Sequence, residues 1–186
     1  MLKYYNYDIV FQEIPDEVTL AINLTCCPNR CDGCHSPHLW EDIGAELTSD
    51  EIDAILRSYL GRITCVCLMG GDNDKNAVEA MATYIKSKYE LRFAWYSGRE
   101  KFPSNIEDFD YVKLGRYDKE KGGLKSADTN QRIYKVNDDF SLNVNGNLVY
   151  YTNNGLSIRG VSIYDIIEPN KQYFFENNSH GGGSFD

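Results

Sequence analysis

Cys27-Pro28-Asn29-Arg30-Cys31-Asp32-Gly33-Cys34 carries three thiols at the spacing C-x3-C-x2-C, directly after a segment patterned as a strand. Gaps of two and three residues allow one short loop to wrap around a single metal centre. Thiolate sulfur selects zinc, Cu(I) or an iron–sulfur cluster over hard cations. Three thiols also leave one position of a four-position site open. If the stretch binds a metal, we expect a soft one, with one position left unfilled by the three cysteines.

The spacing alone leaves three interpretations of these thiols open. A 4Fe-4S cluster held by the three cysteines would keep one iron free for chemistry. A structural zinc site takes four protein ligands, and His35 or His38 would complete one here. Free cysteines that lie close together are also often ordinary apolar core residues that bind no metal. Cys26 adds a fourth thiol, because the spacing from Cys26 to Cys31 is geometrically feasible as well.

Four segments have the pattern of parallel strands. In Glu17–Thr25 apolar and polar residues alternate, as in a strand. Ile63–Met69 is a continuous β-forming run, typical of a strand buried on both faces, and Leu91–Tyr96 and Tyr111–Leu114 are predicted as the third and fourth strands. A short edge strand is expected near Asp8–Phe11. The cysteine motif leaves the carboxyl end of the first parallel strand, where parallel α/β folds place their active sites.

Helices are predicted between these strands. Thr48-Ser49-Asp50-Glu51 matches a capping box, with Thr48 as N-cap and Glu51 reaching back, and Gly61 is expected to end that helix. A second helix starts near Asp74, and Pro103–Asp108 reads as a short helical turn. Such alternation implies parallel strands with right-handed crossovers. Residues 1–136 are thus predicted as an α/β core with too few strands to close an eight-stranded barrel.

The remainder of the chain is predicted as a small addition to this core. Residues 115–136 are charged and contain glycines, which predicts an exposed loop that could touch a partner. Residues 137–175 form a predicted β extension, in which Leu142–Tyr151 reads as a hairpin with an Asn145-Gly146 type I′ turn. Residues 176–186, rich in Asn, Ser and Gly, are predicted as a disordered tail.

Composition narrows the classes of function. The 186 residues carry a net charge of -9 and are 42% hydrophobic. An acidic chain argues against a nucleic-acid-binding surface, which is normally basic. Four of the six cysteines fall within residues 26–34, too close together for a disulfide framework, which favours a reducing cytoplasm. The start of the chain lacks a signal-peptide pattern, and no apolar run approaches a membrane span, so we expect no membrane association.

Several stretches together resemble one family. C-x3-C-x2-C after a first strand is the mark of radical S-adenosylmethionine enzymes, and the glycine before the third cysteine is similar to the anaerobic ribonucleoside-triphosphate reductase activating proteins. The resemblance covers roughly residues 5 to 135 and continues, in the family's order, through Cys34-His35-Ser36-Pro37-His38-Leu39-Trp40, Gly70-Gly71-Asp72, Trp95-Tyr96-Ser97-Gly98, Asp110-Tyr111-Val112-Lys113-Leu114-Gly115 and Thr129-Asn130-Gln131-Arg132.

The resemblance implies a fold and a site. The fold would be a partial, open (β/α) barrel of the radical S-adenosylmethionine type. The ligands of a 4Fe-4S cluster would be Cys27, Cys31 and Cys34, and S-adenosylmethionine would bind at Gly33, Cys34, His35, Gly70, Gly71 and Asp72. The residues allow plainer interpretations beside these. A Gly-Gly-Asp after a strand can be a mere turn, and an aspartate near a helix start is favourable wherever it faces.

The same resemblance implies an activity. Reductive cleavage of S-adenosylmethionine would lead to hydrogen abstraction from a glycine of the large reductase subunit, with no catalytic side chain beyond the cluster and cofactor. The electron donor would be a protein such as flavodoxin or ferredoxin. A pyruvate formate-lyase-like partner and a zinc-binding interaction module remain the alternatives. Lys113 and Ser97-Gly98 end strands at the same rim and are candidate cofactor contacts, whereas Cys65 and Cys67 are expected to be core residues.

Overall fold

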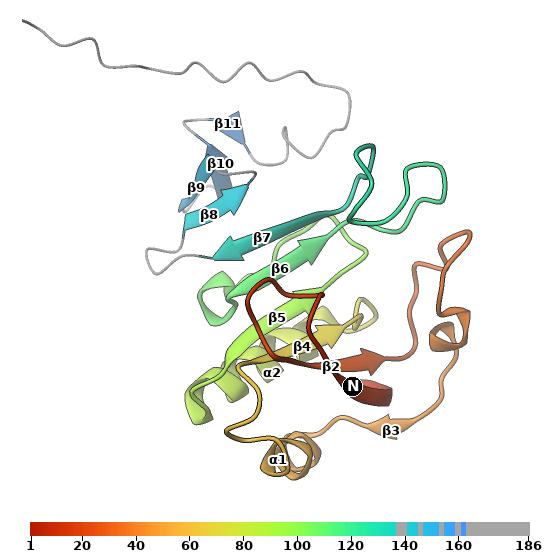
Figure 1. Ribbon diagram of the computed structural model, residues 1–186, viewed down its shortest axis with the longest axis vertical. Coiled ribbons are helices and arrows are strands. Elements are labelled where there is room, and N and C mark those ends of the chain that lie inside the picture. Colours follow the sequence, from red (N-terminus) through yellow and green to blue (C-terminus); the bar gives the residue numbers. More distant parts are fainter. Residues whose placement is uncertain (137–140, 145–146, 153–154, 159–160, 163–186) are drawn as a thin grey trace, which may run out of the picture.

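The computed structural model describes residues 1–136 in full and the backbone of four further strands. Residues 137–140, 145–146, 153–154, 159–160 and 163–186 lie outside the described residues. The described part is a mixed α/β fold built on one open sheet (Figure 1). None of its helices has the length and apolar content needed to cross a membrane.

The sheet of the core has four parallel strands at its centre. Its order is β3-β1-β2-β4-β5-β6-β7, and β2, β4, β5 and β6 are parallel while β1, β3 and β7 run antiparallel to their neighbours. The strands are β1 Lys3–Val10, β2 Thr19–Leu24, β3 Ala45–Glu46, β4 Cys65–Met69, β5 Arg92–Tyr96, β6 Tyr111–Leu114 and β7 Arg132–Val136. The four predicted parallel strands are confirmed, and the sheet stays open within the described residues.

Two α-helices and two short 3-10 helices complete the core: α1 Ser49–Arg57, α2 Lys75–Lys88, η1 Pro37–Trp40 and η2 Ile106–Asp108. Thr48 caps α1 as predicted, because its hydroxyl accepts a hydrogen bond from the Glu51 N–H at 3.2 Å. The Glu51 carboxylate instead accepts from the Tyr4 hydroxyl at 2.5 Å, so the second half of the capping box is replaced by a bond to β1. The helix ends at Arg57, before Gly61.

The two faces of the sheet are covered differently. One face packs against α1 and α2 and forms the main apolar core, to which β4 contributes Val66 and Leu68. The other face carries a smaller apolar cluster and is closed in part by Ile14, from the loop between β1 and β2. Cys65 and Cys67 lie on this second face with no exposed surface, which confirms them as core residues. Burial raises the pKa of both thiols well above its usual value.

Two parts of the predicted secondary structure need correction. The first strand, β1, spans eight residues rather than a short stretch near Asp8–Phe11, and β3 pairs along part of its outer side. Residues 115–136 are not all loop, because β7 occupies Arg132–Val136 and pairs with β6.

The β extension continues the sheet from β7. Its strands are β8 Ser141–Val144, β9 Asn147–Thr152, β10 Gly155–Ile158 and β11 Val161–Ser162. The predicted hairpin is confirmed by the β8–β9 pairing, whereas its Asn145-Gly146 turn and the predicted tail at 176–186 lie outside the described residues.

Candidate cofactor and metal site

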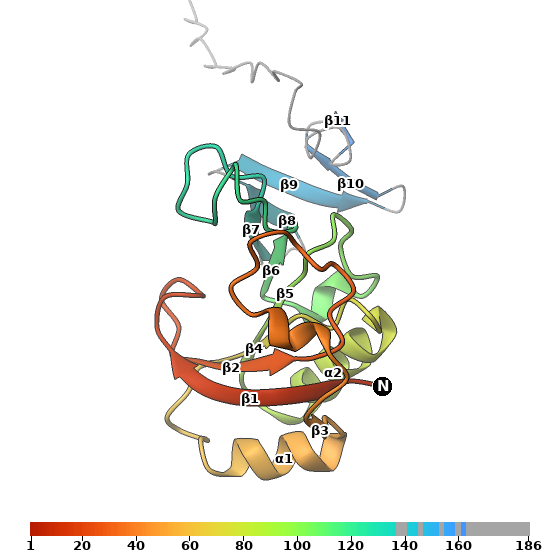
Figure 2. The same cartoon turned by 90° about the vertical axis from the view of Figure 1, so that its right-hand side faces the viewer.

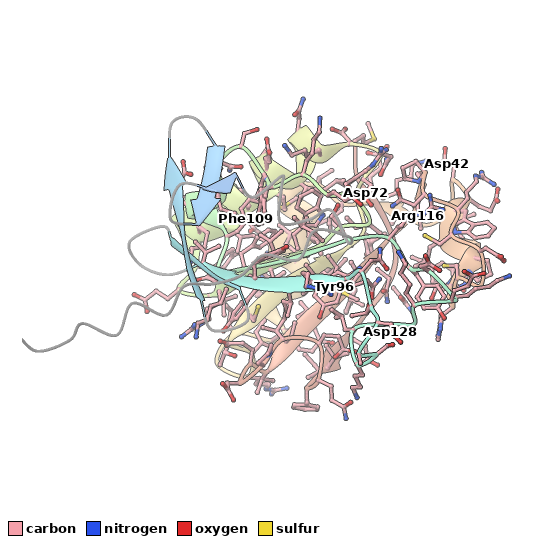
Figure 3. The ribbon with its side chains drawn as sticks, turned by 90° about the horizontal axis from the view of Figure 1, so that it is seen from above. Asp42, Asp72, Tyr96, Phe109, Arg116 and Asp128 are labelled. Carbon is pink, nitrogen blue, oxygen red and sulfur yellow. The ribbon has the colours of Figure 1, made fainter. Side chains whose placement is uncertain are left out.

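The candidate site lies at the carboxyl edge of the four parallel strands. The loop after β2 holds residues 26–34, which we call the cysteine loop, and the turns after β4 and β5 reach the same edge. Figure 2 looks onto this edge, with the cysteine loop and η1 lying across the strand ends. In Figure 3, Asp72 and Arg116 lie toward this end of the sheet and Phe109 lies toward the other. Parallel connectivity thus brings the predicted segments together, as expected.

Asp72 joins three of these connections through its carboxylate. One oxygen accepts a hydrogen bond from the Ser97 hydroxyl at 2.5 Å. The other accepts from the Asn29 side-chain amide at 2.5 Å and from the Gly98 N–H at 2.8 Å. Asp72 is half-buried, so these bonds replace water that the carboxylate would otherwise bind. Asp72 therefore fixes the cysteine loop against the turns after β4 and β5 rather than standing free in solvent.

Gly70 and Gly71 have structural roles in the turn after β4. The Gly70 N–H donates to the Tyr96 carbonyl at 2.9 Å, and the Gly70 carbonyl accepts from the Trp95 indole N–H at 2.7 Å. Gly71 has a φ of +88°, and a Cβ there would lie 2.6 Å from Val78 Cγ2 and 2.9 Å from Leu24 Cδ1. Glycine at 71 is therefore required by the turn and by packing. Each carbonyl still has a second lone pair with which to accept a bond from a ligand.

The cysteines of the loop differ in their surroundings. Cys27 and Cys34 are half-buried and Cys31 is buried, and all are free thiols. Burial raises the Cys27 pKa, while backbone N–H groups of Asn29 and Arg30 hydrogen-bond its sulfur and act in the opposite direction. The Ser36 N–H lies 3.4 Å from Cys34 Sγ. The Cys26 thiol instead donates to Asp42 Oδ1 at 3.6 Å.

The three thiols share one loop without forming one ligand set. Across the part of the chain that the structure describes, no group of three or more His, Cys, Asp and Glu side chains is arranged to hold a metal ion. The donor chemistry nevertheless fits an iron–sulfur cluster, because such clusters are held by thiolates whose sulfurs accept hydrogen bonds. Amide groups already point at two of the sulfurs. The residue types therefore suit an iron–sulfur cluster. To bind one, the three sulfurs would have to move closer together.

Gly33 and His35 lie on the exposed side of the cysteine loop. The His35 ring stacks edge-on against Tyr117 with centroids 5.3 Å apart. Gly33 has a φ of +72°, which favours glycine, and it also faces Tyr117 and Lys119. Both predicted cofactor residues thus contact the loop after β6, and His35 makes no set of metal ligands with the thiols among residues 1–136.

Lys113 is the buried cation of the site. Its side chain comes from β6, residue Lys113 is 7% exposed, and its ammonium donates to the Gly115 carbonyl at 2.6 Å. Burial lowers the Lys113 pKa to about 8, and the electrostatic influence of the neighbouring Asp72 and Cys31 acts against that fall. The remaining N–H donors of this ammonium suit an anionic group at the same edge.

Sequence reasoning missed several residues of this site. Asn29 was only a spacer within the motif, and nothing in the sequence pairs it with Asp72. Tyr117 and Lys119 belonged to a segment predicted as an exposed loop, and their contacts with the cysteine loop depend on tertiary structure.

Comparisons of the chain with models of known families, with curated proteins and with solved structures each found no match. The likeness to reductase activating proteins therefore depends on the motifs alone.

Proposed function

We propose that this chain is a radical S-adenosylmethionine enzyme that activates the large subunit of an anaerobic ribonucleoside-triphosphate reductase. Its open sheet would then be a partial (β/α) barrel of the radical S-adenosylmethionine type. The observation that carries the proposal is the set of three free thiols, spaced C-x3-C-x2-C, in the loop that leaves the first of four parallel strands. Such an enzyme would act in the cytoplasm with a donor such as flavodoxin or ferredoxin.

Cys27, Cys31 and Cys34 would hold a 4Fe-4S cluster. When bound, that cluster supplies the electron for reductive cleavage of S-adenosylmethionine, which leads to hydrogen abstraction from a glycine Cα of the reductase. Cys26 is excluded from the proposed ligand set because its thiol turns toward Asp42. The protein's own contribution is to bind and orient the cofactor and to keep out competing reactions.

The side chains around the thiols suit the two charged ends of an amino acid moiety. The Lys113 ammonium has donors for a carboxylate. The carbonyls of Gly70 and Gly71 have lone pairs for an ammonium group. Asp72 would act through Asn29 and the turn at Ser97-Gly98, which it holds in place. Asp72 is thus proposed as a positioning residue rather than a direct ligand of the amino group.

Anaerobic reconstitution tests the proposal. The chain is loaded with iron and sulfide, reduced with dithionite and incubated with S-adenosylmethionine, and 5′-deoxyadenosine is measured. We expect product from the native sequence and from Cys26→Ala, the matched control. We expect loss of bound iron and of product in Cys27→Ala, Cys31→Ala and Cys34→Ala. Iron retained in Cys27→Ala but lost in Cys26→Ala would refute the ligand assignment.

The partner is tested by adding the reductase large subunit and recording the electron paramagnetic resonance spectrum. A glycyl radical doublet that requires all three motif cysteines supports the proposal. Cofactor cleavage with a radical only on a pyruvate formate-lyase-like protein would replace the partner and keep the chemistry. Stoichiometric zinc after anaerobic purification, with no cleavage of S-adenosylmethionine, would instead identify a zinc-binding interaction module.

A further inference from the structure

The loop between β6 and β7 is ordered by its own hydrogen bonds. Residues 116–130, which we call the cover loop, leave and return to one place, because Leu114 pairs with Arg132. The Gln131 side-chain amide donates to the Gly115 carbonyl at 3.3 Å, and that of Asn130 donates to the Arg116 carbonyl at 3.1 Å. These bonds close the neck of the loop. Compact loops whose ends meet in this way are frequently functional.

The middle of the cover loop is also fixed. The Gly122 N–H donates to the Asp118 carbonyl at 2.8 Å, and the buried Thr129 hydroxyl donates to the Gly122 carbonyl at 3.3 Å. The Thr129-Asn130-Gln131-Arg132 motif therefore has a structural task, since three of its side chains hold the cover loop in shape. Its conformation presents Tyr117 and Lys119 to one neighbour.

That neighbour is the second half of the cysteine loop. Lys119 forms an ion pair with Asp32 at 2.5 Å. A Cβ on Gly33 would lie 3.3 Å from Lys119 Cβ and 3.5 Å from Tyr117 Cε1, so the cover loop lies directly on this backbone. The edge-on stacking of Tyr117 on His35 adds a third contact. All three contacted residues flank the thiols of Cys31 and Cys34.

We propose that the cover loop positions the cysteine loop, with Tyr117 and Lys119 as the positioning residues that hold Cys31 and Cys34 in place at the sheet edge. Cys27 lies on the side of the loop fixed by Asn29 and Asp72, so the two halves of the cysteine loop have separate supports. The inference goes beyond the proposed function, because it holds whichever metal or cofactor the thiols bind.

The test measures alkylation of the metal-free, reduced, full-length chain by iodoacetamide. This reagent is neutral, so its own encounter with the protein depends little on salt. Peptide mass spectrometry follows each cysteine separately. Cys27 serves as a reference within the same loop, and the fully buried Cys65 reports any global unfolding. No metal is needed, so the result is independent of whether the chain cleaves S-adenosylmethionine.

We expect Lys119→Glu to raise the alkylation rates of Cys31 and Cys34 about threefold to fivefold, since an exposed ion pair contributes up to about 1 kcal/mol. Tyr117→Ala should raise them further, because it removes the ring from both Gly33 and His35. The matched variants Lys119→Arg and Tyr117→Phe should behave like the native chain. Combining Lys119→Glu with Asp32→Lys restores an ion pair of opposite polarity and should return the rates toward native values.

Salt provides a second readout that needs no variant. Screening of an exposed ion pair becomes strong when the Debye length falls to about 3 Å near 1 M salt. In the native chain, the alkylation rate of Cys34 relative to that of Cys27 should therefore rise with sodium chloride concentration. In Lys119→Glu this relative rate should not depend on salt. The inference would be overturned if the ratio of the Cys34 to the Cys27 alkylation rate in the native chain did not change with salt concentration. Native rates at Cys31 and Cys34 in both Lys119→Glu and Tyr117→Ala would also overturn it.

Discussion

Replacing Lys113 by methionine is expected to stabilise the metal-free protein at neutral pH. Lys113 is 7% exposed, and its ammonium has a carbonyl, that of Gly115, as its hydrogen-bond partner in the described structure. Burial lowers its pKa from 10.5 to about 8. A charged ammonium is thus less stable in the folded chain than in water, and methionine of similar length removes the charge while keeping the packing.

The magnitude and the pH range follow from this pKa. A fall from 10.5 to about 8 corresponds to a cost of roughly 3 kcal/mol when the group is charged in the folded chain. The lost bond to Gly115 offsets about 1 kcal/mol of the gain. Between these two pKa values the unfolded chain binds more protons, so native stability rises with pH. The cost is complete below about pH 8 and vanishes above 10.5.

Urea unfolding at several pH values tests this reasoning. We expect the free energy of unfolding of Lys113→Met to exceed that of the native chain by about 2 kcal/mol at pH 7. This difference should shrink and then reverse above pH 9. Using the difference between the two chains cancels the titration of all other groups. Lys101→Met, at an exposed lysine, is the control for loss of one positive charge and should change little. A difference between Lys113→Met and the native chain that is constant with pH would refute a buried, destabilised ammonium.

Three further outcomes are expected. Asp72→Ala should release the first half of the cysteine loop, seen as faster alkylation of Cys27 and a loss of about 2 kcal/mol in urea unfolding, because charge-assisted hydrogen bonds are lost; unchanged alkylation would contradict the role of Asp72. Gly71→Val should lower stability by about 2 kcal/mol or more through overpacking against Val78, so weaker binding of S-adenosylmethionine by this variant would report on the fold. Thr48→Ala should cost about 1 kcal/mol by removing the cap of α1, whereas Thr48→Ser should retain it.

The sequence predicted the parallel centre of the fold well, because burial there leaves a strong pattern. Tyr111–Leu114 was predicted residue for residue, and the continuous apolar run of β4 indicated burial on both faces. The antiparallel strands at the two sides of the core, β1 and β7, were harder to predict. In β7 only Tyr134 is buried and charged residues interrupt the apolar ones, so the segment resembles a polar loop. In β1 the central residues are exposed, which removes the alternation that would mark its length.

The candidate site could be predicted in outline because connectivity alone sends the loops after parallel strands to one edge. The contacts between residues within the site could not be predicted from the sequence. Asn29 and Asp72 are 43 residues apart, and their bond exists because β2 and β4 are adjacent in register. Gly71 illustrates the opposite case. A glycine after a strand suggested close approach to a ligand, whereas the nearest atoms to a Cβ there are apolar side chains of the core.

The two supports of the cysteine loop bear on how it could bind a metal. Asn29, between the first two thiols, is tied to Asp72, while Asp32 and Gly33, between the last two, lie against the cover loop. The backbone is therefore held from both sides by contacts with other parts of the chain. A ligand loop ordered before binding loses less conformational entropy when the metal arrives. On the proposed metal-binding role, the sulfurs would still have to draw together, and rotation of the cysteine side chains would contribute to that movement. On the proposed function, the two supports would hold the loop in shape and the sulfurs would be left to bind the metal.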